Sequence, residues 1–336
     1  MSARLPHPRR HPSDVGRGSS QRLTGRSVSV LDQIPRGGRV LIVRLRSLGD
    51  CVLTTPAIHI LKQTRPDLEI AVMVEGRFAA ALTGNPGIAG LLPPSPVTAL
   101  GFRPYLTLNL HGGPRSAWLT AASLARQRAG FAHYRSTPWI YNVKIPSAQE
   151  VLGLDRNRPV HTAEHLAAAM FYLGAAKTEV PRARLFVKPL AGSRPSYAVI
   201  HPFASQPDKT WPPARFVEAA QHIKSELSLE PVFIGGQQDD FTPFNGFQCA
   251  PGSLEDSKRL LSGATLFLGN DSGPAHMAAA FGLPAVVLFG SSHVDQWSPW
   301  KTQAEVIVSP PDVRVVPTVQ VIAALDRLRV RSAPHE

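Results

Sequence analysis

The chain has 336 residues, 43% of them hydrophobic and 18% charged, with a formal net charge of +12. Because domains usually contain about 100–200 residues, this length predicts two domains, each large enough to bury a core. The two cysteines, Cys51 and Cys249, lie far apart without metal-ligand spacing. The composition therefore argues against a disulfide framework and a cysteine-based zinc site, and it favours a reducing cytosol.

The positive charge is concentrated in two segments. Residues 1–38 contain seven Arg and two Asp, and residues 76–149 contain six Arg and one Lys but neither Asp nor Glu. Such a basic field raises the encounter rate with phosphates, nucleic acid or a membrane surface. The alternative is a basic proteome with little selection on surface charge. No secretory signal is visible, and the uncharged stretch 272–294 contains two histidines with repeated glycine and proline, which predicts buried core rather than a membrane span.

The first half of the chain predicts a basic tail followed by an α/β domain. Residues 1–38 are rich in Arg, His, Pro, Ser and Gly, so we expect a disordered or loosely attached tail, with order beginning at Arg39. The apolar run 40–43 is typical of a strand buried in a parallel sheet, and it opens a strand–helix–strand unit. The expected elements are strands at 40–43, 70–74, 106–110 and 128–131 and helices at 51–64 and 117–125.

The second half repeats this pattern after a helix at 162–173 and a connecting segment at 181–195. Its expected elements are strands at 197–200, 231–234, 265–268 and 285–289 and helices at 213–227, 254–261 and 275–281. Two consecutive doubly wound units predict two α/β domains that face a cleft. The expected divisions are a tail (1–38), an N-terminal domain (39–188), a C-terminal domain (189–316), and a C-terminal helix with its tail (317–336).

Three polar clusters follow predicted strands in the second half, where open α/β sheets bind their ligands. They are HPFASQPDK (201–209), GGQQDD (235–240) and NDSGPAH (270–276). In the last cluster, Ser272 and Gly273 place a hydroxyl and backbone N–H groups at a helix N-terminus, which suits a phosphate. An ordinary helix cap is the alternative and, for this cluster alone, the more common explanation.

The other two clusters supply groups that fit a nucleotide diphosphate. Lys209 can provide a cation, the pair Gly235 and Gly236 permits close backbone approach, and Asp239 or Asp240 can accept from ribose hydroxyls. A solvated lysine and a plain turn with solvated acids are the alternatives. No G-x-x-x-x-G-K-[ST] occurs, and no G-x-G-x-x-G follows a strand, which weakens ATPase and nicotinamide hypotheses.

Asp50 stands in the first half, after the first strand and at a helix N-terminus. It can cap that helix, or it can act as a general base for an acceptor hydroxyl. Sugar transfer with inversion needs such a base, together with cationic or helix-dipole stabilisation of the departing diphosphate. Asp50 on one domain would then serve as the base, and Lys209 and Ser272 on the other domain would stabilise the diphosphate.

Over residues 39–320 the chain resembles glycosyltransferase family 9, the ADP-heptose:lipopolysaccharide heptosyltransferases. The resemblance rests on four segments taken together and in this order: 39–58, 201–212, 233–240 and 266–290. The resemblance implies a GT-B fold of two Rossmann-like domains and an inverting reaction without an obligatory metal or cofactor. It also implies an ADP-heptose donor on the C-terminal domain. The acceptor would be inner-core lipopolysaccharide on the N-terminal domain, at the cytoplasmic membrane face.

By motif match, the resemblance makes Asp50 the candidate base and Lys209 its catalytic partner at the leaving diphosphate. The candidate donor-binding residues are Ser205, Gly235, Gly236, Asp239, Asp271, Ser272, Gly273 and His276. The sequence departs from the family pattern at Phe203, where the family commonly has Gly, and at Ser272, where Thr is more usual. The basic tail also lies outside the pattern, either as a tether to anionic lipid or as a disordered extension.

The acid-free segment 76–149 fits a phosphorylated acceptor, an inference that comes from its charge. The candidate acceptor contacts are Arg115, Arg126, Arg128 and Arg135. The competing hypotheses are the same fold with another sugar or acceptor, and a non-catalytic nucleotide-sugar-binding protein. Nucleic-acid binding ranks lowest, because aromatic residues make up only 7% of the chain and no nucleic-acid module is found.

Overall fold

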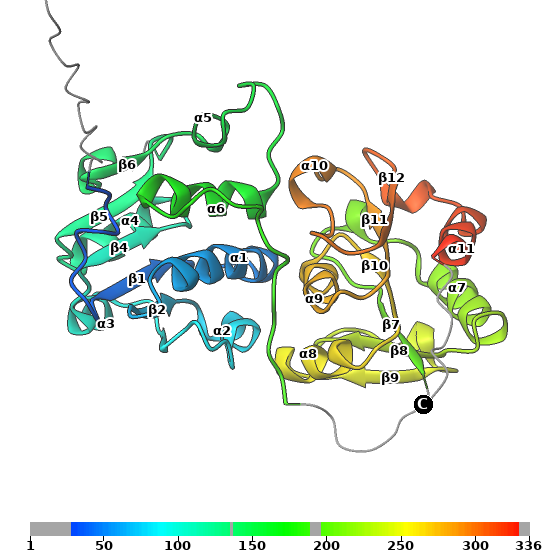
Figure 1. Ribbon diagram of the computed structural model, residues 1–336. Helices are drawn as coiled ribbons and strands as arrows, with labels where there is room; N and C mark the ends of the chain where they lie inside the picture. The colour runs from blue at the N-terminus through cyan, green and yellow to red at the C-terminus, as the bar shows by residue number, and fades with distance from the viewer. Residues whose placement is uncertain (1–27, 135–136, 189–195, 329–336) are drawn as a thin grey trace, which may run out of the picture.

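A computed structural model describes residues 28–134, 137–188 and 196–328. These residues form two six-stranded parallel sheets with helices on both faces of each, joined by an extended segment that runs between the two halves (Figure 1). The predicted α/β architecture of two Rossmann-like domains is therefore confirmed.

The N-terminal sheet has the strand order β3-β2-β1-β4-β5-β6. Its strands are β1 (Arg39–Val43), β2 (Glu69–Met73), β3 (Gly90–Leu92), β4 (Leu106–Asn109), β5 (Gln127–Phe131) and β6 (Val143–Ile145). Its helices are α1 (Leu48–Thr64), α2 (Gly76–Leu82), α3 (Pro96–Phe102), α4 (Pro114–Ala122), α5 (Ala148–Leu152) and α6 (Thr162–Leu173), with a 3-10 turn η1 at Pro138–Ile140. The strand order reverses between β1 and β4, and a crevice forms at such a reversal.

The C-terminal sheet repeats the arrangement, with the order β12-β11-β10-β7-β8-β9. Its strands are β7 (Tyr197–His201), β8 (Glu230–Gly235), β9 (Gln248–Pro251), β10 (Leu266–Asn270), β11 (Ala285–Phe289) and β12 (Ala304–Val308). Its helices are α7 (Pro213–Ser225), α8 (Leu254–Ser262), α9 (Gly273–Phe281), α10 (Val294–Trp297) and α11 (Thr318–Arg327). The reversal between β7 and β10 places the ends of these two strands at the second crevice.

The central strands match the expected ranges closely, and α6 and β11 have the expected bounds. The outer strands β3, β6, β9 and β12 were not expected. They are three to five residues long, and most of their side chains are only partly buried. A strand paired on one side does not need the unbroken apolar run that marks a central parallel strand, so its sequence signal is weak.

The expectation that order begins at Arg39 is wrong. The side chains of Leu31 and Ile34 are only 1% and 3% exposed, and they pack in the core between the N-terminal sheet, α1 and α6. Arg65 at the end of α1 donates hydrogen bonds to the carbonyl oxygens of Leu31 and Ile34. Residues 28–38 therefore belong to the N-terminal domain, whereas residues 1–27 lie outside the described residues.

Helix α11 likewise belongs to the C-terminal domain rather than to a separate segment. Val321, Ala324 and Leu325 are fully buried in the core that α11 shares with α7. The expected division at residue 189 and the last residues, 329–336, fall outside the described part of the chain. Within the residues that the structure describes, no helix is both long enough and apolar enough to cross a membrane.

Candidate active site

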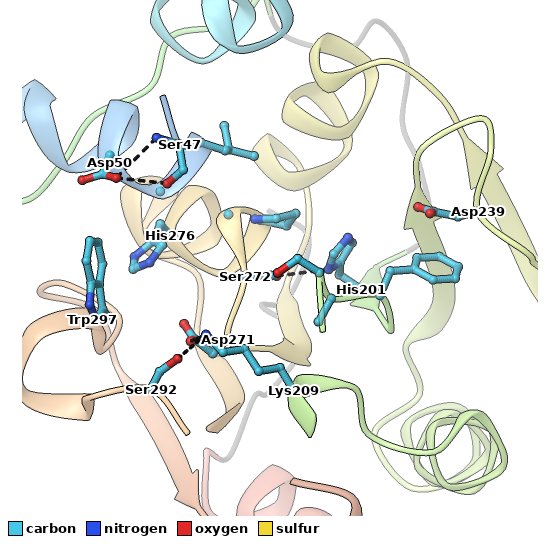
Figure 2. A pocket seen from close by; sticks show the side chains of 17 residues that line it. Ser47, Asp50, His201, Lys209, Asp239, Asp271, Ser272, His276, Ser292 and Trp297 are labelled. Atoms are coloured by element: carbon cyan, nitrogen blue, oxygen red, sulfur yellow. Dashed lines mark hydrogen bonds and ion pairs between the residues drawn. The ribbon is translucent and has the colours of Figure 1, made fainter. Parts of the chain in front are cut away.

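A cavity of about 640 Å³ lies between the two domains, at the carboxyl ends of their central strands. The N-terminal domain contributes residues 47–50, at the start of α1. The C-terminal domain contributes residues at or after the ends of β7, β8, β10 and β11. Figure 2 shows Asp50 and Asp239 at opposite ends of this cavity, with Ser272 and Lys209 between them. The cavity therefore brings the predicted polar clusters of both domains together.

Asp50 lies in the first turn of α1, and both of its carboxylate oxygens are engaged. Oδ1 accepts from Arg44 Nη1 at 3.0 Å, and Oδ2 accepts from the backbone N–H and the hydroxyl of Ser47 at 3.3 and 3.1 Å. The side chain thus caps the helix and also faces the cavity, so capping does not exclude the other role considered for it. Each carboxylate oxygen has two lone pairs, which leaves room for a further proton donor.

Arg44 holds Asp50 in this position and was not among the predicted site residues. It follows β1 directly, its side chain is 5% exposed, and its Nε has no hydrogen-bond partner in the described structure. A buried guanidinium requires a nearby carboxylate, because an unpaired buried charge is costly. Because β1 is buried on both faces, alternation along the strand does not indicate which way Arg44 points, so no local sequence pattern could have found it.

Ser272 is the residue before α9, yet its hydroxyl does not cap that helix. The hydroxyl lies 3.1 Å from His201 Nδ1 at the end of β7. Burial lowers the pKa of His201 to about 4, so its ring is neutral near pH 7. The first turn of α9 contains no acidic residue, and Gly273 opens it beside the cavity. The positive end of the helix dipole is therefore available to an anion.

Lys209 is the cation that the C-terminal domain contributes to this cavity. Its Nζ donates to Ser292 Oγ at 2.6 Å and lies 3.8 Å from Asp271 Oδ2. The neighbouring Asp208 accepts from the hydroxyl of Ser291 at 3.0 Å, which ties the same loop to the end of β11. An ammonium group has three donors, so one N–H of Lys209 can still point at a ligand.

His276 packs against the other domain rather than standing free in the cavity. It projects from α9 onto the start of α1, where a β-carbon at Gly49 would come within 2.5 Å of its Cδ2 atom. A β-carbon at Gly273 would similarly come within 2.5 Å of Leu48. Burial lowers the pKa of His276 to about 4, so this ring is also neutral near pH 7. The N-termini of α1 and α9 can therefore approach each other closely, because Gly49 and Gly273 have no side chains.

The GGQQDD turn differs in detail from what its sequence predicts. A β-carbon at Gly235 would lie 2.5 Å from Phe203, and neither Gly235 nor Gly236 lines the cavity. The glycines therefore make room for Phe203 and for Asp239, which lines the cavity and accepts from the Gly236 N–H at 2.7 Å. Asp240 does not line the cavity, and it accepts from the Thr242 N–H.

The four candidate acceptor arginines are not brought together. Arg115 lies in the first turn of α4, after the carboxyl end of β4, where it pairs with Glu75 at 3.0 Å. Arg126 and Arg128 lie at the opposite end of the sheet, around the start of β5. There Arg128 donates to the carbonyl oxygens of Ala125 and Ile140. Arg135 lies outside the described residues.

Further cavity residues were not among the predicted site residues. Ser205 and Asp271 line the cavity as expected, and the lining is completed by Ser47, Leu48, Gly49, His201, Phe203, Ala204, Pro274, Ser292 and Trp297. A second cavity of about 520 Å³ lies between the α5–α6 side of the N-terminal domain and α10, and His133, Arg158, His165 and Gln296 are among its lining residues. In the described segments, no three His, Cys, Asp or Glu side chains gather as they would around a metal ion.

Comparison with known proteins gives a consistent result. The model of glycosyltransferase family 9 (heptosyltransferase) matches residues 105–314. Lipopolysaccharide heptosyltransferase 3 of Escherichia coli K12 is 25% identical over 340 residues, which cover 86% of this chain and 98% of that protein. Lipopolysaccharide heptosyltransferase 1 of Salmonella typhimurium is 24% identical over 294 residues, which cover 75% and 88%.

Solved structures show the same fold. Escherichia coli ADP-heptose LPS heptosyltransferase II superposes with a TM-score of 0.73 at 18% identity, covering 86% of this chain and 98% of that one. Escherichia coli heptosyltransferase WaaC with ADP gives 0.73 at 20% identity, covering 86% and 99%. The two-domain GT-B arrangement of this chain is therefore shared with these structures.

Proposed function

This chain belongs to glycosyltransferase family 9, the heptosyltransferase family, and from this premise we propose that it transfers heptose from ADP-heptose to an anionic lipopolysaccharide inner core. The chain is thus a glycosyltransferase, and the proposal concerns its donor, its acceptor and the roles of its residues. The observation that carries the proposal is the interdomain cavity, which joins Asp50 of one domain to Lys209 and Ser272 of the other.

The order of groups along the cavity fits a nucleotide sugar. Asp239 lies at one end, Ser272 and Lys209 in the middle, and Asp50 at the other end (Figure 2). We assign the ribose to Asp239, the diphosphate to Lys209, Ser272 and Gly273 at the start of α9, and the sugar to the Asp50 end. In this orientation the anomeric carbon lies next to Asp50, which belongs to the N-terminal domain, whereas the other groups named belong to the C-terminal domain.

The proposed reaction is a single displacement at the anomeric carbon. Asp50 accepts the proton of an acceptor hydroxyl, and the oxygen forms its bond to the anomeric carbon on the face opposite the diphosphate. The bond between that carbon and the diphosphate oxygen breaks, and ADP leaves with the bonding electron pair. The anomeric configuration is therefore inverted. A positioned base of this kind contributes about 10²–10⁴-fold to the rate.

Only a few groups of the cavity can stabilise the leaving diphosphate. His201 and His276 are neutral near pH 7 because burial lowers the pKa of each to about 4. The positive potential at the diphosphate therefore comes from Lys209 and from the N–H groups at the start of α9. We propose that these groups act without an obligatory metal ion or other cofactor.

The acceptor is proposed to bind on the N-terminal domain, where its phosphates would meet basic side chains. Among the arginines predicted for this role, Arg115 lies at the carboxyl end of the sheet, near the edge that carries Asp50. Arg158 in the second cavity is a further candidate. We place the reaction at the cytoplasmic face of the membrane that holds the acceptor, with the protein associated peripherally.

The experiment that tests this function is a calorimetric titration of the purified protein with ADP-heptose, ADP, UDP and UDP-glucose. We expect selective binding of ADP and ADP-heptose. A preference for uridine nucleotides would contradict the donor assignment while leaving the fold and mechanism intact. Absence of binding to any of them would contradict the proposed function, and Phe203 would be the first residue to replace with glycine.

A further inference from the structure

Two tryptophans are exposed next to each other on the N-terminal domain. Trp118 on α4 is 57% exposed and Trp139 on η1 is 68% exposed, and their ring centroids lie 5.7 Å apart in an edge-to-face arrangement. Large aromatic side chains are normally buried in the core or in an interface, because each removes a large apolar area from water. An exposed pair of this size marks an interaction surface.

Other exposed apolar side chains extend this pair into a surface. Ten large apolar residues are exposed in the described part of the chain, and five of them belong to α3, α4, η1 and the turn after α4. We call these five the Trp118 surface: Val97, Leu100, Trp118, Leu124 and Trp139. Helices α3 and α4 contact each other, and α4 contacts η1, so these side chains share one outer layer.

The same two helices bury a different set of side chains. Ala99 on α3 and Leu119 on α4 pack on the face of the N-terminal sheet opposite α1 and α6. A helix that covers one face of a sheet normally presents polar residues outward. In α3 and α4, however, Val97, Leu100 and Trp118 point away from that core, so both faces of the layer carry apolar groups.

Two exposed arginines, Arg103 and Arg126, adjoin these apolar side chains along the chain. Residues 76–149 carry seven basic residues and no acidic residue. Arg103 follows α3 directly, Arg126 follows the turn that contains Leu124, and both are exposed. Neither has an acidic partner among the residues that the structure describes, and Arg126 lies over the ring of Tyr105. The layer therefore combines protruding indole rings with unpaired guanidinium groups.

We propose that the Trp118 surface docks onto the anionic surface of a phospholipid bilayer. Indole rings favour the headgroup region of a membrane, since they combine an apolar ring with one polar N–H. Arg103 and Arg126 would lie against lipid phosphates, and anionic leaflets attract such cations. A protein partner instead needs pockets for its anchoring side chains. None of the five residues lines either cavity described above.

This surface also suits the position of the cavity. Helix α4 starts at the carboxyl end of β4, the edge of the sheet at which Asp50 lies, and Trp118 follows one turn later. A bilayer against α4 would present the head of a lipid-anchored acceptor to the interdomain cavity. This link to the cavity rests on the proposed function, whereas the docking itself does not require any nucleotide.

The test is co-sedimentation of the full-length protein with phosphatidylcholine vesicles prepared with and without phosphatidylglycerol. We expect binding to the anionic vesicles, weaker binding at higher salt, and a blue shift of tryptophan fluorescence. The double variant Trp118→Ala/Trp139→Ala should lower the partition coefficient about tenfold or more and abolish the shift. Because every variant keeps residues 1–27, the charge of that segment contributes equally to each measurement.

The matched control is Tyr172→Ala, an exposed aromatic residue on α6, which should bind vesicles like the wild type. Circular dichroism and thermal melting establish that each variant is folded. Equal binding of the double variant and the wild type, or no vesicle binding at all, overturns the proposal. Self-association that is lost in the double variant, without vesicle binding, would assign the surface to a second copy of the chain instead.

The docking proposal and the proposed function fail separately. A protein that binds vesicles through Trp118 and Trp139 but no nucleotide would contradict only the proposed function. Selective ADP binding without vesicle binding would contradict only the docking surface. The two measurements therefore discriminate between the two proposals.

Discussion

The ring of His276 lies against the backbone of Gly49, so closely that a β-carbon at Gly49 would come within 2.5 Å of Cδ2 and 3.0 Å of Nε2. Gly49 belongs to the N-terminal domain and His276 to the C-terminal domain. The contact adjoins Asp50, and it therefore sets how closely the candidate base approaches the groups on α9. Both residues line the cavity.

The Gly49→Ala variant tests this contact. The added methyl group cannot fit unless His276 or the whole of α9 moves, and overpacking of this kind costs about 1–3 kcal/mol. We expect a lower free energy of unfolding and a loss of turnover of roughly tenfold or more, because small misplacements of catalytic groups slow a reaction strongly. Gly76→Ala is the control, since nothing lies within 4 Å of the β-carbon it would add. Equal effects of the two variants would contradict the close contact.

Replacement of Asp50 tests the general base. Asp50→Ala and Asp50→Asn should lower kcat by about 10²–10⁴-fold while the affinity for ADP-heptose stays nearly unchanged. Steady-state kinetics and calorimetry measure the two quantities separately. Because Asp50 also caps α1, Ser47→Ala serves as the control. It removes the hydroxyl that donates to Asp50 but leaves the carboxylate, so its loss of kcat should be much smaller. Near-normal turnover of Asp50→Ala would refute the assignment.

Replacement of Lys209 tests the diphosphate site. A hydrogen bond to a charged group contributes about 1.5–3 kcal/mol, so Lys209→Ala should raise the Kd for ADP by roughly 10–100-fold and also lower kcat. Lys224→Ala, which removes an exposed lysine paired with Glu230, should leave both unchanged. If Lys209→Ala bound ADP as the wild type does, the diphosphate would have to lie elsewhere in the cavity.

The buried histidines predict how stability depends on pH. Burial lowers the pKa of His165, His201 and His276 to about 4, whereas an unfolded histidine titrates near its ordinary pKa of 6.5. Between these values the unfolded chain binds more protons than the folded chain. The free energy of unfolding should therefore fall as the pH decreases from about 6.5 to 4, by at most about 1.4 kcal/mol per pH unit for each histidine.

Urea unfolding at pH 7 and pH 5 measures this dependence. His165 stacks on Phe131 outside the active-site cavity, with ring centroids 4.1 Å apart. His165→Phe removes one titrating group and should therefore reduce the difference in stability between the two pH values. A difference as large as that of the wild type would show that His165 is not responsible for its expected share.

The central strands could be predicted from the sequence because strands buried on both faces need continuous apolar runs, as in β1 and β11. The convergence of Asp50, Lys209 and Ser272 on one cavity was predicted for a related reason. Residues that follow parallel strands meet at the same edge of their own sheet, and when two such domains face a cleft, both edges border it. Segment 28–38 was mistaken for part of the tail, because its four apolar residues show no clear periodicity and only two of them, Leu31 and Ile34, are buried in the core.

The sequence by itself therefore determined the two α/β domains, their family and the polar clusters at their cleft, since all of these follow from local periodicity and motif spacing. Only the tertiary structure decided the ion pair of Arg44 with Asp50, the contact of His276 with Gly49, and the packing of Trp118 on Trp139. In each of these contacts, the distance between the two residues depends on how strands and helices pack. The number of residues that separates them along the sequence does not determine that distance.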